Sequence, residues 1–227
     1  MGSAEFDQFA SCYEKTMERS CAISGESPDF YAEQRIEWCL RRLRRYLPIG
    51  TVLDFGCGVG GSIGYFFEIL GCSSVIGVDP SVESLETARR RHPDRNLRLS
   101  TPENFVPSGT IPLAFCYGVF HHIPPADRLP ALGYIRAALS ENGILAFWEN
   151  NPWNPLVVYS MSLNEFDRNA NRLSPLRSVR LLKQAGFRVE FVDYCFFFPH
   201  FARGLRALEP ALKWLPLGAQ YLVLARK

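Results

Sequence analysis

Short apolar runs and amphipathic segments alternate along the middle of the chain, which is typical of an α/β protein with a parallel sheet. Glycine, proline or polar residues separate the runs, and the amphipathic segments repeat their apolar positions at helical spacing. The pattern predicts helices at 30–46, 62–70, 82–91 and 126–139. It predicts strands at 52–55, 74–79, 97–99, 113–117 and 144–148, with a turn at 141–143 before the last of these.

Both ends of the chain depart from this alternation. Residues 150–175 show neither period, so we expect this stretch to be irregular. The arginines of the first helix are expected on its solvated faces, and they are Arg41, Arg42, Arg44 and Arg45. The tail predicts a helix at 176–185, a strand at 187–196, a helical insertion at 200–215 broken by Pro210 and Pro216, and a final antiparallel strand at 219–225.

The composition fits one domain over residues 1–227, since 227 residues with 47% hydrophobic content can bury one full core. The 25 Lys and Arg nearly balance the 23 Asp and Glu, which argues against a nucleic-acid partner. Seven cysteines without a C-x-x-C pair suit a cytoplasmic protein and predict no metal site. Neither a signal peptide nor a membrane-spanning run is visible. We therefore expect a monomer or homodimer with at most a weak interfacial membrane contact.

A glycine-rich loop follows the first strand of the alternation. Gly56, Gly58 and Gly61 satisfy G-x-G-x-x-G, a spacing that lets the backbone approach a ligand closely. Asp79 ends the next strand, where a carboxylate can accept hydrogen bonds from a ribose. These features fit both a nicotinamide-dependent oxidoreductase and a nucleoside-binding transferase. Asp54 favours the transferase, because its carboxylate would repel a pyrophosphate and attract a cation. S-adenosylmethionine carries a sulfonium and an ammonium, and no phosphate.

Four segments together resemble class I S-adenosylmethionine-dependent methyltransferases that act on small molecules. They are VLDFGCGVGG (52–61), IGVDPS (76–81), FCYGVFHHIP (115–124) and LSENGILAFWE (139–149). The resemblance implies a Rossmann-like α/β fold: a seven-stranded, mostly parallel sheet with its last strand antiparallel and helices on both faces. It also implies an N-terminal lid and helix at 1–46, a cofactor-binding core at 47–150, and a substrate-side cap with the last strands at 151–227.

The resemblance also implies a set of residues that bind S-adenosylmethionine. Asp54 and the loop are expected at the methionine half, Asp79 at the ribose and Pro80 at the adenine. Thr101 stands where the family often has an acidic residue. Tyr13 belongs to a segment that resembles a lid. The full set is Tyr13, Asp54, Phe55, Gly56, Cys57, Gly58, Asp79, Pro80, Thr101, Pro102 and Tyr117.

Two histidines follow the fourth strand, at the sheet edge where ligands bind in this architecture. His121 suits the role of general base because histidine titrates near neutral pH. The resemblance implies Glu149, at the end of the fifth strand, as its acidic partner. A purely structural role for the histidine pair is the alternative. We expect substrate contacts from His122, Asn150, Asn151 and Trp153.

The sequence therefore predicts a methyltransferase that uses S-adenosylmethionine to methylate an oxygen or nitrogen of a small, partly apolar molecule. Two alternatives stay open at this point. One is a nicotinamide-dependent oxidoreductase, and the other is a non-catalytic cofactor-binding subunit of a larger complex.

Overall fold

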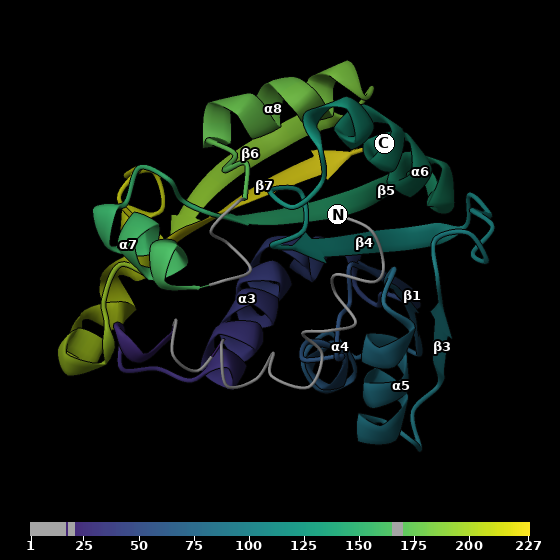
Figure 1. The fold of residues 1–227 in the computed structure, drawn as a ribbon, viewed down its shortest axis with the longest axis horizontal. Helices are drawn as coiled ribbons and strands as arrows, with labels where there is room; N and C mark the ends of the chain where they lie inside the picture. Colours follow the sequence, from purple (N-terminus) through teal and green to yellow (C-terminus); the bar gives the residue numbers. More distant parts are fainter. Residues whose placement is uncertain (1–16, 18–20, 165–169) are drawn as a thin grey trace.

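The computed structural model describes residue 17 and residues 21–164 and 170–227, so the predicted lid residue Tyr13 lies outside the described residues. The described strands form one sheet in the order β3-β2-β1-β4-β5-β7-β6 (Figure 1). Strands β3 to β5 of this order pair in parallel, and β7 lies antiparallel to both β5 and β6. This confirms the predicted fold class. The strands are β1 (Thr51–Phe55), β2 (Ser74–Val78), β3 (Leu97–Ser100), β4 (Ile111–Tyr117), β5 (Leu139–Asn150), β6 (Arg188–Cys195) and β7 (Gln220–Arg226).

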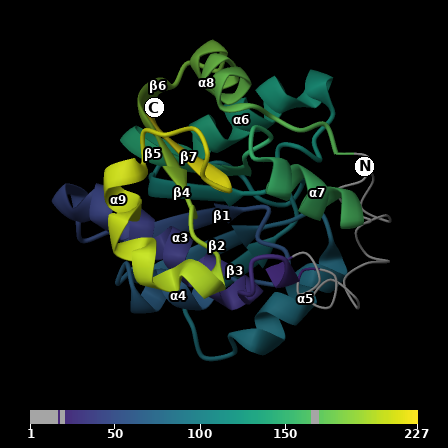
Figure 2. The ribbon, with the colours of Figure 1, turned by 90° about the vertical axis from the view of Figure 1, so that its left-hand side faces the viewer.

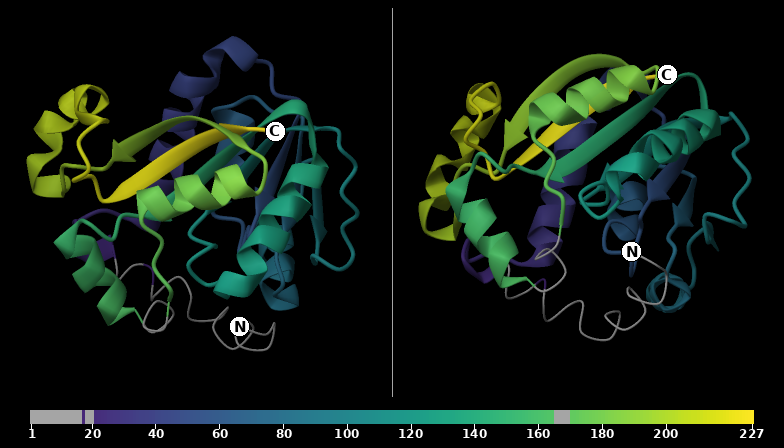
Figure 3. Two further views of the ribbon diagram at one scale, coloured as in Figure 1. Left: turned by 90° about the horizontal axis from the view of Figure 1, so that it is seen from above. Right: turned by 45° about the horizontal axis from the view of Figure 1, so that its top comes forward.

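Helices cover both faces of this sheet (Figures 1 and 3). Helices α3, α4 and α5 bury apolar side chains against one face, and α6 and α8 against the other. Since both faces are covered, the central strands are apolar along their whole length and do not alternate. The helices are α3 (Pro28–Leu43), η1 (Arg44–Tyr46), α4 (Ile63–Glu68), α5 (Val82–Arg91), η2 (Pro125–Asp127), α6 (Arg128–Ala138), α7 (Pro155–Leu163), α8 (Pro175–Gln184), η3 (His200–Leu208) and α9 (Glu209–Leu212).

The expectation that residues 150–175 are irregular is wrong, because this stretch contains helix α7. Asn154 caps the helix by accepting hydrogen bonds from the amides of Leu156 and Val157. Pro155 occupies the first turn, where its missing N–H costs nothing. Ser27 followed by Pro28, and Ser174 followed by Pro175, begin α3 and α8 in the same way. The cap and proline were therefore a readable helix signal.

Two other predicted boundaries also need correction. Strand β5 begins at Leu139 and not at Ile144, and the predicted turn is an irregularity within it, with Asn142 at φ 63°. Pro210 does not break the helical insertion. It lies in the first turn of α9, which begins at Glu209 and ends at Leu212. A proline at this position fits the start of a helix as well as a break.

The arginines of α3 differ in their surroundings. Arg41 is exposed as expected, but Arg42 is not part of a solvated face. It forms an ion pair with Asp193 of β6, whose carboxylate also accepts a hydrogen bond from the Trp38 indole at 2.8 Å. This buried carboxylate thereby fastens α3 to the edge of the sheet.

Helix α7 and the η3–α9 segment lie at the end of the sheet where β4 and β5 stop (Figures 1 and 2). The Asn151 amide donates to the carbonyls of Pro216 and Gly218, and the Asn154 amide donates to that of Leu217. These bonds join the residues that precede α7 to the loop that follows α9, although the two are far apart in sequence. Among the described helices, none is long and apolar enough to cross a bilayer.

Candidate functional site

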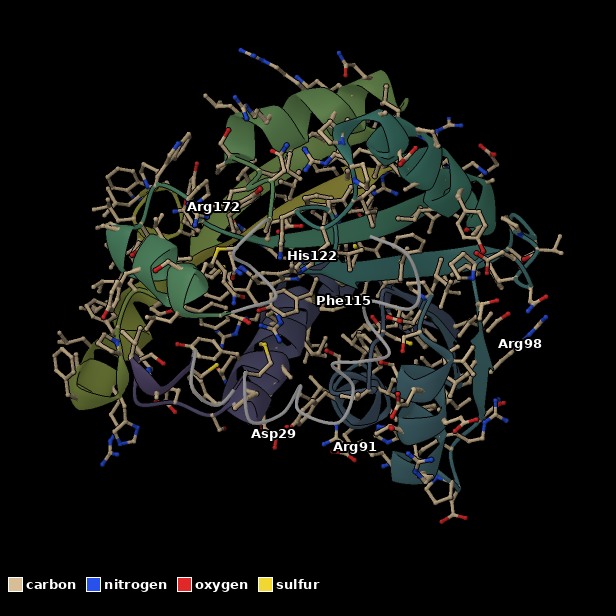
Figure 4. The ribbon with its side chains drawn as sticks, in the orientation of Figure 1. Asp29, Arg91, Arg98, Phe115, His122 and Arg172 are labelled. Carbon is tan, nitrogen blue, oxygen red and sulfur yellow. The ribbon has the colours of Figure 1, made fainter. Side chains whose placement is uncertain are left out.

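A cavity of about 1080 Å³ lies between the glycine loop and the segments at the end of the sheet. This volume is at the upper end of the range for small-molecule sites, about 300–1,000 Å³. Asp29 of α3 and Arg91 at the end of α5 are among the residues that line it (Figure 4). Of the predicted site residues, six line this cavity: Asp54, Gly56, Cys57, Gly58, Tyr117 and Asn150.

The glycine loop is held in place by backbone hydrogen bonds. Gly56 donates its amide to the Val78 carbonyl at the end of β2, at 2.7 Å. It adopts φ 77°, and a Cβ added there would lie 2.2 Å from a Val119 methyl carbon. His92 contacts the Gly60 carbonyl from the end of α5. The loop therefore needs glycine at position 56 for its backbone conformation and for space.

Asp79 holds the other side of this loop. Its carboxylate accepts the amide of Gly58 at 2.8 Å and that of Ser81 at 2.9 Å. A carboxylate has about four acceptor positions, so these two bonds are compatible with a further contact to a ribose. Asp79 does not line the cavity, and its predicted role at the ribose stays a prediction.

Asp54 is a buried carboxylate that faces the cavity from the end of β1. Burial, and to a smaller extent repulsion from Asp79, raise its pKa to about 7, although the positive charge of Arg35 opposes both. The cost of burying this charge is repaid only if a cation approaches it. The site therefore favours a positively charged ligand group next to the glycine loop.

Arg35 is the unpredicted residue of the site. It is 4% exposed, lines the cavity, and lies with its guanidinium 3.5 Å from the centre of the Tyr117 ring. One guanidinium nitrogen donates to the side-chain oxygen of Gln220 at 3.2 Å, but its Nε is buried with no partner among the described residues. An incompletely satisfied buried guanidinium is costly unless an anion reaches it.

A sequence signal for Arg35 was present. Helix α3 buries Ala32, Ile36, Cys39 and Leu43 at helical spacing, and Arg35 falls within this apolar stripe. A charged residue at a stripe position needs a partner or a function. The arginines further along the same helix form a nearly continuous run and are therefore a more visible feature of the sequence than Arg35.

Aromatic residues of the tail form the cavity wall opposite the glycine loop. Phe197 and Phe198 line the cavity, and Glu209 of α9 fixes their backbone by accepting the amides of residues 196–198 at 3.1–3.2 Å. Glu26, which precedes α3, accepts hydrogen bonds from His200 and Arg206 of η3. These contacts bring the two ends of the described chain together around the cavity.

The predicted catalytic pair meets, as the sequence suggested. The Nδ1 atom of His121 lies 2.6 Å from Oε2 of Glu149, and the other carboxylate oxygen accepts the Phe120 amide. Both side chains are buried, and neither lines the cavity. The contact orients the imidazole, which is what either a base or a structural pair requires. Their roles stay predictions.

The other predicted residues lie away from the cavity lining. Phe55 packs near Phe120 and Tyr134, and the Pro102 carbonyl accepts the Tyr134 hydroxyl. Asn151 is fully buried and uses its side chain to hold the backbone. Trp153 is partly exposed and stacks near Tyr194. The cavity lining also excludes Pro80, Thr101 and His122.

The residues present fit the amino-acid end of S-adenosylmethionine. The buried carboxylate of Asp54 would suit the ammonium and sulfonium, and the Nε of Arg35, which has no partner among the described residues, would suit the carboxylate. The sheet order is the one that the resemblance to class I methyltransferases implied.

Comparisons with known proteins agree with the predicted resemblance to methyltransferases. Residues 53–145 match the family model described as "Methyltransferase domain". A trans-aconitate 2-methyltransferase of Rhodopseudomonas palustris (strain HaA2) is 34% identical over 109 residues, which are 47% of this chain and 42% of the relative. The match thus spans less than half the length of that relative.

Solved structures share the fold at low identity. A SAM-dependent methyltransferase of Thermotoga maritima superposes with a TM-score of 0.64 at 20% identity, covering 98% of both chains. A geranyl diphosphate C-methyltransferase of Streptomyces coelicolor, solved with S-adenosyl-L-homocysteine, gives a TM-score of 0.60 at 16% identity, covering 84% of this chain and 75% of that one. Residues 53–145 thus match a methyltransferase domain in sequence, and the chain shares its fold with methyltransferases of known structure.

Proposed function

We propose that this protein transfers a methyl group from S-adenosylmethionine to an oxygen or nitrogen of a small, partly apolar molecule. The observation that carries the proposal is the pair of buried, cavity-facing charges beside the glycine loop, Asp54 and Arg35. They complement the ammonium and the carboxylate of one zwitterionic ligand. The bound cofactor supplies the methyl group and the sulfur leaving group, while the protein positions the acceptor and excludes water.

The cavity wall formed by the tail supports an acceptor with an apolar body. The curated relatives are named for trans-aconitate, a tricarboxylate, and such an acceptor requires several available cations. In this chain Arg206 is paired with Glu26, and Phe197 and Phe198 form the neighbouring wall. Arg41 and Arg91 also line the cavity, so its lining combines this apolar wall with basic side chains.

The general-base role of His121, with Glu149 as its orienting partner, is part of the same proposal. His121→Ala separates the two interpretations. A base role predicts a lower turnover with unchanged affinity for the cofactor. A structural role predicts a lower melting temperature with unchanged turnover per folded molecule.

Calorimetry with S-adenosylhomocysteine and with 5′-methylthioadenosine tests the cofactor site. The first ligand carries the amino-acid end and the second lacks it. Arg35→Gln should weaken binding of S-adenosylhomocysteine at least about tenfold, since a charged hydrogen bond is lost. It should leave 5′-methylthioadenosine unchanged. Arg44→Gln, an exposed arginine beyond the end of the same helix, is the matched control. Absence of S-adenosylhomocysteine binding to the wild type would refute the proposal.

The acceptor itself can be found by mass spectrometry. A metabolite extract incubated with the protein and S-adenosylmethionine should yield a product heavier by one methylene, about 14 Da. An extract incubated with the Arg35→Gln variant serves as the background.

The predicted domain organisation, oligomeric state and cellular location stay proposals. The six cysteines in the described part of the chain are free, which supports a reducing cytoplasmic location. We propose one domain over residues 1–227 that acts as a monomer or homodimer. Size-exclusion chromatography with light scattering measures the oligomeric state.

A further inference from the structure

Large apolar side chains gather at one end of the molecule. In the described part of the chain fifteen of them are exposed, and nine of these lie in residues 151–164 and 200–217. Phe201 is 89% exposed and Trp214 is 70% exposed. We call the nine the cap face: Trp153, Leu156, Tyr159, Leu163, Phe201, Leu205, Leu208, Trp214 and Leu217. Apolar residues scattered singly need no explanation, but a cluster of this kind indicates a binding surface.

The two segments of the cap face lie at the same end of the molecule and both line the cavity (Figures 1 and 2). Helix α7 and the η3–α9 segment occupy the same end of the molecule in all views of the ribbon (Figures 1, 2 and 3). The hydrogen bonds of Asn151 and Asn154 to the carbonyls of Pro216, Leu217 and Gly218 hold them together. The cap face is therefore built from two parts of the sequence that both border the cavity.

The charge of this surface is positive. Residues 151–164 contain no charged side chain. Residues 200–217 contain one acid, Glu209, which is buried and bound to backbone amides, while Arg203 is exposed and Lys213 is partly exposed. Apolar and aromatic residues flanked by basic ones are typical of surfaces that bind anionic bilayers. A second copy of the chain would instead bring like charges together.

The cap face is continuous with the cavity. Leu156 and Phe201 are exposed on the cap face and also line the cavity. The cavity therefore opens among the same apolar residues that would contact lipid. An apolar acceptor could move from a bilayer into the cavity without crossing water.

We propose that the cap face docks this protein on an anionic lipid bilayer, and that the acceptor is an apolar molecule resident in that bilayer. The docking stands on the surface alone. The statement about the acceptor rests on the proposed methyl transfer.

Vesicle binding in the absence of cofactor tests the docking. The protein should sediment with vesicles of phosphatidylcholine and phosphatidylglycerol, and at least about tenfold more weakly with phosphatidylcholine alone. Salt should weaken the binding, because it screens exposed charges. Trp153 and Trp214 are the exposed tryptophans of the described chain. Their fluorescence emission maximum should shift to shorter wavelength when they enter lipid.

Variants of the cap face locate the contact. Leu208→Ser with Trp214→Ser should lower the vesicle affinity at least about tenfold, because two apolar side chains no longer leave water. Arg203→Gln with Lys213→Gln should lower it by about the same factor, and only on anionic vesicles. None of these four residues lines the cavity.

Matched controls come from the other end of the molecule. Arg98 lies on the outer strand β3, away from the cap face (Figure 4). Val106 is 78% exposed in the loop between β3 and β4. Arg98→Gln and Val106→Ser should leave vesicle binding unchanged.

Three outcomes would overturn the docking: no binding of the wild type to anionic vesicles, equal weakening by the control variants, or a dimer in light scattering that Trp214→Ser dissociates. The last would assign the cap face to a second copy. Because these measurements use no cofactor, their failure leaves the methyl-transfer proposal untouched. Conversely, failure to bind S-adenosylhomocysteine would leave the docking intact.

Discussion

The cavity has two walls that are built by opposite means. The wall at the glycine loop consists of consecutive residues held largely by backbone bonds, such as those from the amides of Gly56 and Cys57 to the Val78 carbonyl. The opposite wall takes residues from both ends of the described chain and is held by a few side chains, chiefly Glu26 and Glu209. The first wall has local geometry that admits little change. The second depends on contacts between segments distant in sequence.

This difference teaches where change can be tolerated. A ligand common to many enzymes needs a wall that stays the same, and backbone bonds supply it with little dependence on side-chain identity. An acceptor that differs from enzyme to enzyme needs a wall that can be altered, and surface segments such as α7 and η3 can change without disturbing the sheet. Substitutions should therefore cost more stability at the first wall than at the second.

The largest effect is expected at Gly56. Gly56→Ala places a Cβ in a left-handed conformation 2.2 Å from a Val119 methyl carbon, so both strain and overlap oppose it. We expect a loss of at least about 2 kcal/mol of unfolding free energy. The melting temperature, measured by calorimetry, should fall by at least about 5 °C.

Gly61→Ala is the control for this substitution, because a Cβ there meets no atom within 4 Å. Its change should stay within about 0.5 kcal/mol. The double variant Gly56→Ala with Val119→Ala removes the overlap and keeps the backbone strain. Equal stability of the Gly56 and Gly61 variants would show that the first wall is not rigid.

A smaller effect is expected from the pH dependence of Asp54. Its pKa is about 7 in the folded protein, against an ordinary value of about 3.9. The pKa is raised, so the stability that this group contributes is fully present below about pH 3.9 and is lost as pH rises through about 7. An ammonium favours the ionised form, so ligand affinity should rise over the upper part of this window.

Calorimetry with S-adenosylhomocysteine measures this dependence. A group of pKa about 7 is mostly protonated at pH 6.0 and mostly ionised at pH 7.5, so the affinity should rise roughly eightfold between the two. Asp54→Asn should bind more weakly and lose this rise. A variant that keeps the full pH dependence would assign it to another group.

The two walls also differ in how far the sequence predicts them. The order of the elements from β1 to β5, the loop at 56–61 and the contact of His121 with Glu149 follow from local motifs. Arg35 was not predicted as a site residue because its side-chain partner, Gln220, is 185 residues away in the sequence. Helix α7 was missed because Asn154 and Pro155, which signal its start, also occur where a turn begins.

The smallest effect is expected at Glu209, and it concerns the second wall alone. Glu209→Gln keeps the size of the side chain and one acceptor oxygen, but it replaces the other with a donor that faces a backbone amide. The loss should be about 1 kcal/mol. Hydrogen exchange of the amides at 196–198 should quicken about fivefold, and the affinity for S-adenosylhomocysteine should not change. Glu86→Gln, on the exposed surface of α5, is the control. Weakened cofactor binding in the Glu209 variant would mean that the two walls are coupled, and the wall at the tail could not then change independently of the cofactor site.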